Sequence, residues 1–268
     1  MGCRSSKADQ QSDSLQTAAW QKTPLVIDGS DSDWVKPLPY FDRREKLGYA
    51  LSNDRDNLYI RVGTRDPQEQ RKIIEGGMTV WINRKGEKEE GESLGIGFPT
   101  DSRNDREKNL MASARPDLYK NKQQSLEDLK EYALFGFDKE NPVQYFPCGK
   151  GNGSGVEVSI DINRNGELVY EAKLPFAAIY PSNTNPLNSR KSIAVGIFLE
   201  GVVPRPGERR GGGGGGVSIG GGMGMGSFGS GGGLGLSIGT GSLARIGGGR
   251  SSMDKQTRIW QVVDLARH

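Results

Sequence analysis

Histidine is almost absent from this 268-residue chain, since His268 at the very end is its single copy. Most acid–base and nucleophilic mechanisms use an imidazole to move a proton, and many metal sites use it as a ligand. Cys148 therefore has no histidine partner that would activate its thiol. Carboxylate pairs stay open, because they need only two acidic side chains. On balance the sequence predicts a protein that is not an enzyme and that has no cofactor.

Cysteine and long apolar runs are scarce as well. With only Cys3 and Cys148, a disulfide-rich secreted scaffold is excluded by count. No run of 18 apolar residues occurs, so no segment is expected to span a membrane. The chain also has no large excess of one charge sign, because its 36 basic and 33 acidic residues are interspersed, as in 87–90 and 105–108. Such mixing is typical of a solvated surface and predicts no nucleic-acid partner.

Glycine, in contrast, is abundant, with 40 residues that concentrate between 211 and 249. A segment this rich in glycine loses too much backbone entropy to fold alone. Residues 1–22 are polar and resemble a flexible tether. We therefore predict a disordered tether over 1–22 and a single domain over 23–268, with 211–249 as a loop inserted before the last strand. That loop either stays disordered or orders against a partner or a surface.

Alternation of apolar and polar residues predicts many short strands. The strongest pattern runs from Val156 to Ile162, turns at 163–166 and returns over 168–174, which predicts a hairpin. Short helices are expected at 67–74 and, after Ser125, at 126–134. Many strands with little helix predict a mainly β fold, an antiparallel β-sandwich. The other expected strands are 24–27, 48–52, 58–62, 78–82, 95–98, 193–203 and 258–265.

Four sequence blocks carry a family resemblance. They are Val-Ile-Asp-Gly at 26–29 with Trp34, Leu-Tyr-Ile at 58–60, Val-Trp-Ile-Asn at 80–83, and Tyr-Glu-Ala-Lys-Leu-Pro-Phe at 170–176. In this order and spacing they resemble the family-nine carbohydrate-binding modules and the related DOMON sandwiches. An asparagine ends the third block, where the family has aspartate. The resemblance implies a β-sandwich and suggests sugar recognition, as in envelope lipoproteins of Gram-negative bacteria.

Tyr59, Trp81 and Arg61 are the candidate ligand-binding residues. Tyr59 and Trp81 should point away from the buried Ile60 and Ile82, because side chains alternate along a strand. If that outward side is open, each ring offers a flat surface for a sugar and Arg61 offers hydrogen-bond donors. If a second layer covers it, both rings are core.

Three aspartates follow the first expected strand, at positions 28, 31 and 33. Carboxylate oxygens are calcium ligands, but the spacing does not match an EF-hand loop. Capping of the turn is the favoured interpretation, and no metal site is predicted.

The chain begins Met1-Gly2-Cys3-Arg4-Ser5-Ser6. Gly2-Cys3 is the remnant of a bacterial lipobox, part of an N-myristoylation and palmitoylation pattern, or chance. The resemblance to envelope lipoproteins favours the lipobox. It predicts Cys3 as the lipidation site, membrane contact through this anchor alone, and a place in the bacterial cell envelope, as a periplasmic or outer-membrane lipoprotein.

Two functions follow from these expectations. The first is a non-catalytic carbohydrate-binding-like domain that a lipid anchor displays on the envelope, with a glycan as partner. The alternative is a structural or protein-interaction lipoprotein, with an envelope protein as partner and the same scaffold. A haem-binding role fits poorly, because no histidine ligand lies within the domain.

Overall fold

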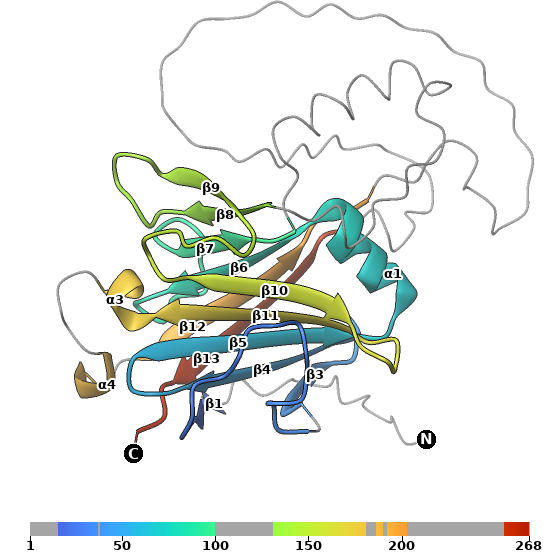
Figure 1. Cartoon of the computed structure of the whole chain (residues 1–268), viewed down its shortest axis with the longest axis horizontal. Coiled ribbons are helices and arrows are strands. Elements are labelled where there is room, and N and C mark those ends of the chain that lie inside the picture. The colour runs from blue at the N-terminus through green and yellow to red at the C-terminus, as the bar shows by residue number, and fades with distance from the viewer. Residues whose placement is uncertain are drawn as a thin grey trace, which may run out of the picture.

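Two β-sheets pack face to face in the computed structural model (Figure 1), which describes residues 16–36, 38–99, 131–180, 186–189, 192–202 and 255–267. In these residues, sheet A has the order β1-β13-β12-β6-β7-β8-β9, and sheet B has the order β10-β11-β5-β4-β2, with β3 paired to β4. Strands pair antiparallel, except that β1 joins β13 and β2 joins β4 in parallel. The predicted mainly antiparallel β-sandwich is confirmed, whereas 1–15 and the glycine-rich 211–249 lie outside the described residues.

The elements are short, as the sequence predicts. Sheet A contains β1 (Gln16–Thr17), β6 (Met78–Asn83), β7 (Leu94–Gly97), β8 (Glu131–Phe135), β9 (Val143–Pro147), β12 (Ile193–Leu199) and β13 (Thr257–Asp264). Sheet B contains β2 (Ala19–Trp20), β3 (Tyr40–Asp42), β4 (Leu47–Asn53), β5 (Asn57–Thr64), β10 (Glu157–Ile162) and β11 (Leu168–Pro175). The described helices are α1 (Pro67–Arg71), its π-helical continuation η1 (Lys72–Gly76), α3 (Phe176–Ile179) and α4 (Pro186–Ser189). None of these is long and apolar enough to cross a membrane.

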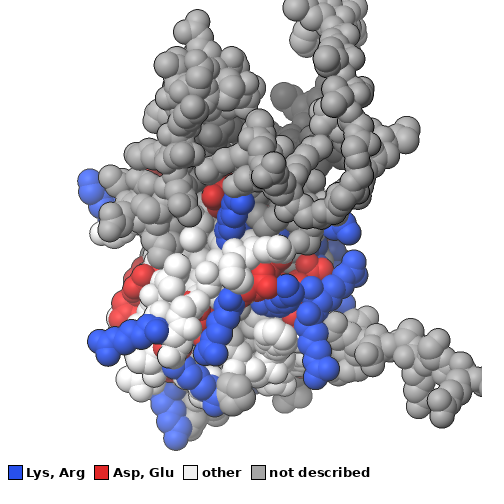
Figure 2. Space-filling model, turned by 90° about the vertical axis from the view of Figure 1, so that its right-hand side faces the viewer, with Lys and Arg blue, Asp and Glu red and all other residues white. Residues whose placement is uncertain are grey.

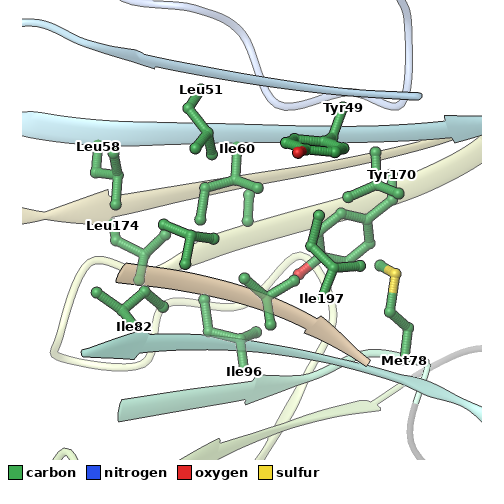
Figure 3. Close-up of a cluster of buried hydrophobic side chains, with 14 of the residues drawn as sticks. Tyr49, Leu51, Leu58, Ile60, Met78, Ile82, Ile96, Tyr170, Leu174 and Ile197 are labelled. Carbon is green, nitrogen blue, oxygen red and sulfur yellow. The ribbon is translucent and has the colours of Figure 1, made fainter. Parts of the chain in front are cut away.

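The core lies between the two sheets (Figure 3), where every second residue of each strand meets its counterparts from the other sheet. Ile60 of β5 and Ile82 of β6 both lie in this cluster, as their alternation with polar neighbours predicts. Tyr170 is also buried there, and its hydroxyl has no hydrogen-bond partner among the described residues. The hydrophobic pattern therefore identified the inner face of both sheets.

The predicted helix at 67–74 is present because its start is well capped. The carboxylate of Asp66 accepts hydrogen bonds from the backbone amides of Gln68 and Glu69, and Pro67 occupies the first turn. The chain continues as η1 and stops at Gly77, whose φ of 89° disfavours other residues. Asp66 thus caps a helix that the sequence located.

Three expectations are wrong. Residues 16–20 form β1 and β2, so the boundary predicted at residue 23 lies too late in the chain. Residues 24–27 form no strand, because they lie across the outer face of sheet B. Residues 131–134, expected to be helical, belong to β8, because they pair with β7 and β9 and alternate between the two faces of sheet A.

A buried carboxylate holds the N-terminal segment, residues 24–36, against sheet B. Glu171 of β11 is fully buried, and one of its oxygens accepts a 2.5 Å hydrogen bond from the indole Nε1 of Trp34. The other oxygen accepts bonds from the backbone amides of Gly29, at 2.7 Å, and Asp28, at 3.2 Å. Gly29 is required there, because its φ is 84° and a Cβ would lie 2.8 Å from that of Asp161.

We predict that Glu171→Gln lowers the free energy of unfolding by about 2 kcal/mol, because the new amide group would face a donor in either orientation. Burial raises the pKa of Glu171 above its ordinary 4.5, so the folded state binds the proton more tightly. This residue's contribution to stability therefore falls as the pH rises from about 4.5 through the folded pKa. Urea unfolding across this range should show that slope in the parent and its loss in the variant. Unchanged stability and slope would contradict the anchoring role of Glu171.

Candidate ligand-binding surface

The three candidate residues do not share one surface. Trp81 lies on β6 in sheet A, whereas Tyr59 and Arg61 lie on β5 in sheet B. All three side chains point away from the core between the sheets, as alternation predicts, but they leave the sandwich on opposite sides. Tyr59 and Trp81 therefore cannot hold one ligand between them.

Tyr59 is fully buried, which corrects the expectation of an open ring. It packs with Leu25, Trp34 and Ala50 beneath the N-terminal segment. Its hydroxyl donates a 2.6 Å hydrogen bond to the carboxylate of Asp54. The cause is the N-terminal segment itself, which was expected to form a strand at 24–27 and instead packs over the outer face of sheet B.

Arg61 is also buried, with 1% of its side chain exposed. It lies directly opposite Glu171 in the ladder between β5 and β11. Its Nη2 is 3.0 Å from Glu167 and 3.6 Å from Asp31, while its Nε has no hydrogen-bond partner among the described residues. Arg61 therefore stabilises two carboxylates from inside the domain, and a ligand on the surface does not reach it.

Two of the three aspartates at 28, 31 and 33 cap turns, as predicted, and the third forms ion pairs. Asp28 and Asp33 accept hydrogen bonds from the backbone amides of Ser30 and Val26, which caps the turns around them. Asp31 instead forms ion pairs with Lys36 and Arg61. Within the described residues, no group of three or more His, Cys, Asp or Glu side chains is placed to hold a metal ion.

Trp81, in contrast, belongs to an ordered row on the outer face of sheet A. The pairing register places five residues side by side across five consecutive strands, and they alternate between aromatic and glycine. We call this set the aromatic row. In order from β8 to β13, it consists of Phe135, Gly95, Trp81, Gly196 and Trp260.

The glycines let the aromatic rings lie flat on the sheet. A Cβ at Gly95 would lie 2.6 Å from the ring of Trp81 and 2.9 Å from that of Phe135, so no larger residue fits. A Cβ at Gly196 would lie 2.9 Å from the ring of Trp260 in the same way. The rings of Phe135 and Trp81 are 5.8 Å apart and tilted by 32°. The row is therefore a flat apolar strip, in which each tryptophan covers a glycine of the neighbouring strand.

Exposure differs along this strip. Trp81 in the middle is 8% exposed, while Phe135 and Trp260 on either side are half-buried. Tyr145 of the edge strand β9 points to the same side and is 48% exposed. A ligand on the strip would thus contact mainly Tyr145, Phe135 and Trp260. The sequence identified Trp81 but missed the other rings, because the signal is a register across strands and no local motif contains it.

Arg258 provides a polar group beside the strip. Its guanidinium lies 4.9 Å from the centre of the Phe198 ring, and its Nη1 is 3.0 Å from a carboxylate oxygen of Glu90. The ring of Phe198 meets that of Trp260 edge to face at 5.5 Å. Hydrogen-bond donors therefore stand beside the apolar strip.

A hollow lies elsewhere, on sheet B. It has a volume of about 490 Å³ and is lined by residues 28–31 and 161–165, at one end of sheet B. Its lining is open and mostly polar, and it contains no aromatic ring on which a sugar could stack. The aromatic row remains the better candidate surface.

Comparisons with known proteins add little. No family model and no curated protein matches this chain. Among solved structures, it is similar to a family 9 carbohydrate-binding module from Caldicellulosiruptor kristjanssonii in complex with glucose. That match has a TM-score of 0.36 and 10% identity, and covers 69% of this chain and 77% of that chain. A likeness of this size carries no argument about the ligand. The choice of a candidate surface therefore rests on the side chains of this protein.

We predict that Arg61→Ala lowers the free energy of unfolding by about 3 kcal/mol, because two carboxylates lose the buried cation that faces them. Arg65→Ala is the matched control, since Arg65 contacts the same Glu167 from the solvent side and should cost about 0.5 kcal/mol or less. Equal losses in the two variants, measured by urea unfolding, would show that Arg61 has no special structural role.

Proposed function

We propose that this chain is a non-catalytic carbohydrate-binding domain and that the aromatic row is its ligand-binding surface. The observation that carries the proposal is the alternation of aromatic rings with glycines across five strands of sheet A. Flat rings stack against the apolar faces of sugar rings, and nearby donors such as Arg258 bind hydroxyl groups. The resemblance in the sequence blocks agrees with this proposal.

The strip is long enough for a short oligosaccharide chain. Neighbouring strands lie about 4.8 Å apart, so the distance from β8 to β13 is about 19 Å. Phe135 and Trp260 stand near the two ends, and each is open enough to contact a sugar ring. We therefore infer that the ligand is an extended glycan lying across the strands.

A lipid anchor would place this domain on the bacterial cell envelope. Gly2-Cys3 and the polar residues that follow it support acylation of Cys3. The test is mass spectrometry of the protein isolated from its own membrane, which should find an acylated Cys3. An unmodified Cys3 in a soluble fraction would contradict the anchor.

A role in protein interaction has one specific observation in its favour. Among the described strands, β9 forms an edge of sheet A, and its Val143 and Tyr145 are exposed. An exposed apolar edge can pair with an extended segment of another protein. A partner bound there would cover Tyr145 but would leave Trp260, at the far end of the row, accessible.

We predict that Trp260→Ala lowers affinity for a glycan by about tenfold or more, because the variant loses one of the three accessible rings of this surface. Trp81→Ala should mainly destabilise the domain, by about 3–5 kcal/mol, since Trp81 is nearly buried. Binding is measured on a glycan array and then by calorimetry with the best ligand, and stability by urea unfolding.

Phe41→Ala is the matched control, because Phe41 is an exposed aromatic residue of sheet B, outside the aromatic row. It should retain full glycan affinity. An array without any retained glycan, or equal losses in Trp260→Ala and Phe41→Ala, would contradict the proposed surface.

A further inference from the structure

One end of the sandwich carries many exposed cations. This cationic end consists of the β3–β4 turn (residues 43–46), the β5–α1 connection with Arg65, helix α1 with Arg71, the β10–β11 turn (163–166), and Lys36 of the N-terminal segment. The amide of Gln70 in α1 bonds to the carbonyl of Gly166, which joins two of these loops. Figure 2 looks onto this end and shows Lys and Arg side chains projecting around acidic side chains that lie closer to the domain.

Five of the described ion pairs at this end share one orientation, with the cation on the solvent side. In five pairs the cation is 31–89% exposed, while its carboxylate partner is only 14–24% exposed. The outer layer is therefore positive, although the sequence has nearly equal numbers of both charges. The pairs are Lys36–Asp31, Arg44–Glu45, Lys46–Asp66, Arg65–Glu167 and Arg71–Glu75.

Buried cations neutralise the acids from below. Arg61 contacts both Asp31 and Glu167, so two carboxylates face one buried and two exposed cations. In the same way, the buried Lys72 contacts the buried Glu69, 3.1 Å away. The carboxylates of Asp31 and Glu167 thus face three cations, which leaves this cluster with one net positive charge.

Ion pairs elsewhere differ. In Lys85–Glu92 the side chains are 58% and 62% exposed, and in Arg258–Glu90 they are 44% and 43% exposed. Anion and cation there reach solvent equally, and their fields cancel outside the protein. The positive layer is thus a property of the cationic end.

Exposed apolar side chains lie among these cations. Phe41 precedes the β3–β4 turn and is 59% exposed, and Val35 next to Lys36 is 72% exposed. Ile162, at the start of the β10–β11 turn, is also exposed. Large apolar residues mixed with long cations are typical of surfaces that enter the headgroup region of a membrane.

We propose that the cationic end docks on an anionic lipid surface. Its cations come from separate loops at one rounded end and reach outward on flexible side chains, which suits a plane of phosphate groups. An acidic polysaccharide fits this end less well, because the hollow beside the cations is lined by the carboxylates of Asp28, Asp31 and Asp161. This contact is independent of both the lipid anchor and the aromatic row.

The test uses the full chain carrying Cys3→Ser, so that acylation cannot contribute, with vesicles of phosphatidylglycerol and phosphatidylcholine. We expect the protein to sediment with these vesicles and to dissociate from them as the salt concentration rises. It should not sediment with vesicles of pure phosphatidylcholine. Arg43→Gln, Arg44→Gln and Arg65→Gln together should lower the partition coefficient about 100-fold, at about fivefold for each cation.

The control combines Lys85→Gln, Lys88→Gln and Lys139→Gln, which remove the same charge elsewhere and should change partitioning by less than about threefold. Equal losses in the two triple variants would overturn the proposal, as would a parent that binds a soluble acidic polysaccharide but no vesicle.

Phe41→Ser should lower partitioning about tenfold at fixed charge, and an unchanged value would overturn apolar insertion. Unfolding midpoints of all variants are compared with the parent.

Discussion

The buried carboxylate of Glu171 is the contact on which the arrangement of this domain depends. It joins the indole of Trp34 and the amide of Gly29 to β11, although these residues are about 140 positions apart in the chain. A carboxylate removed from water is costly unless donors surround it, so the contact specifies one position for the N-terminal segment. The first and last of the four sequence blocks that resemble family nine meet at this point.

This contact decides which side of the sandwich is open. Once the N-terminal segment covers sheet B, Tyr59 and Arg61 are buried, and both serve the stability of that cover. The outer face of sheet A has no such cover among the described residues of the N-terminal segment, and there aromatic side chains from β6, β8 and β13 fill the space above two glycines. Our proposal of a glycan surface follows from this difference between the faces.

The same cover creates the charge asymmetry of one end. Arg61 is enclosed between sheet B and the N-terminal segment, where it holds Asp31 and Glu167 inward. The solvent-side partners of these carboxylates, Lys36 and Arg65, are left to define the outer potential. A nearly neutral composition can therefore present a positive surface, because the cations of these pairs reach further into the solvent than their carboxylates. The sequence analysis expected only a mixed, solvated surface.

Much of the fold was determined by the sequence alone. Alternation of apolar residues, the turn ending at Gly166 and the cap at Asp66 are local, and local sterics and hydrogen bonds suffice to specify strands, the hairpin and the helix. The direction in which Tyr59 and Trp81 point was also predictable from the period of two along a strand. What covers each ring was not, because it depends on which distant segment packs there. The tertiary structure alone placed Tyr59 under the N-terminal segment and Trp81 in a row with Trp260, since strand register and segment packing are set by contacts between residues far apart in the chain.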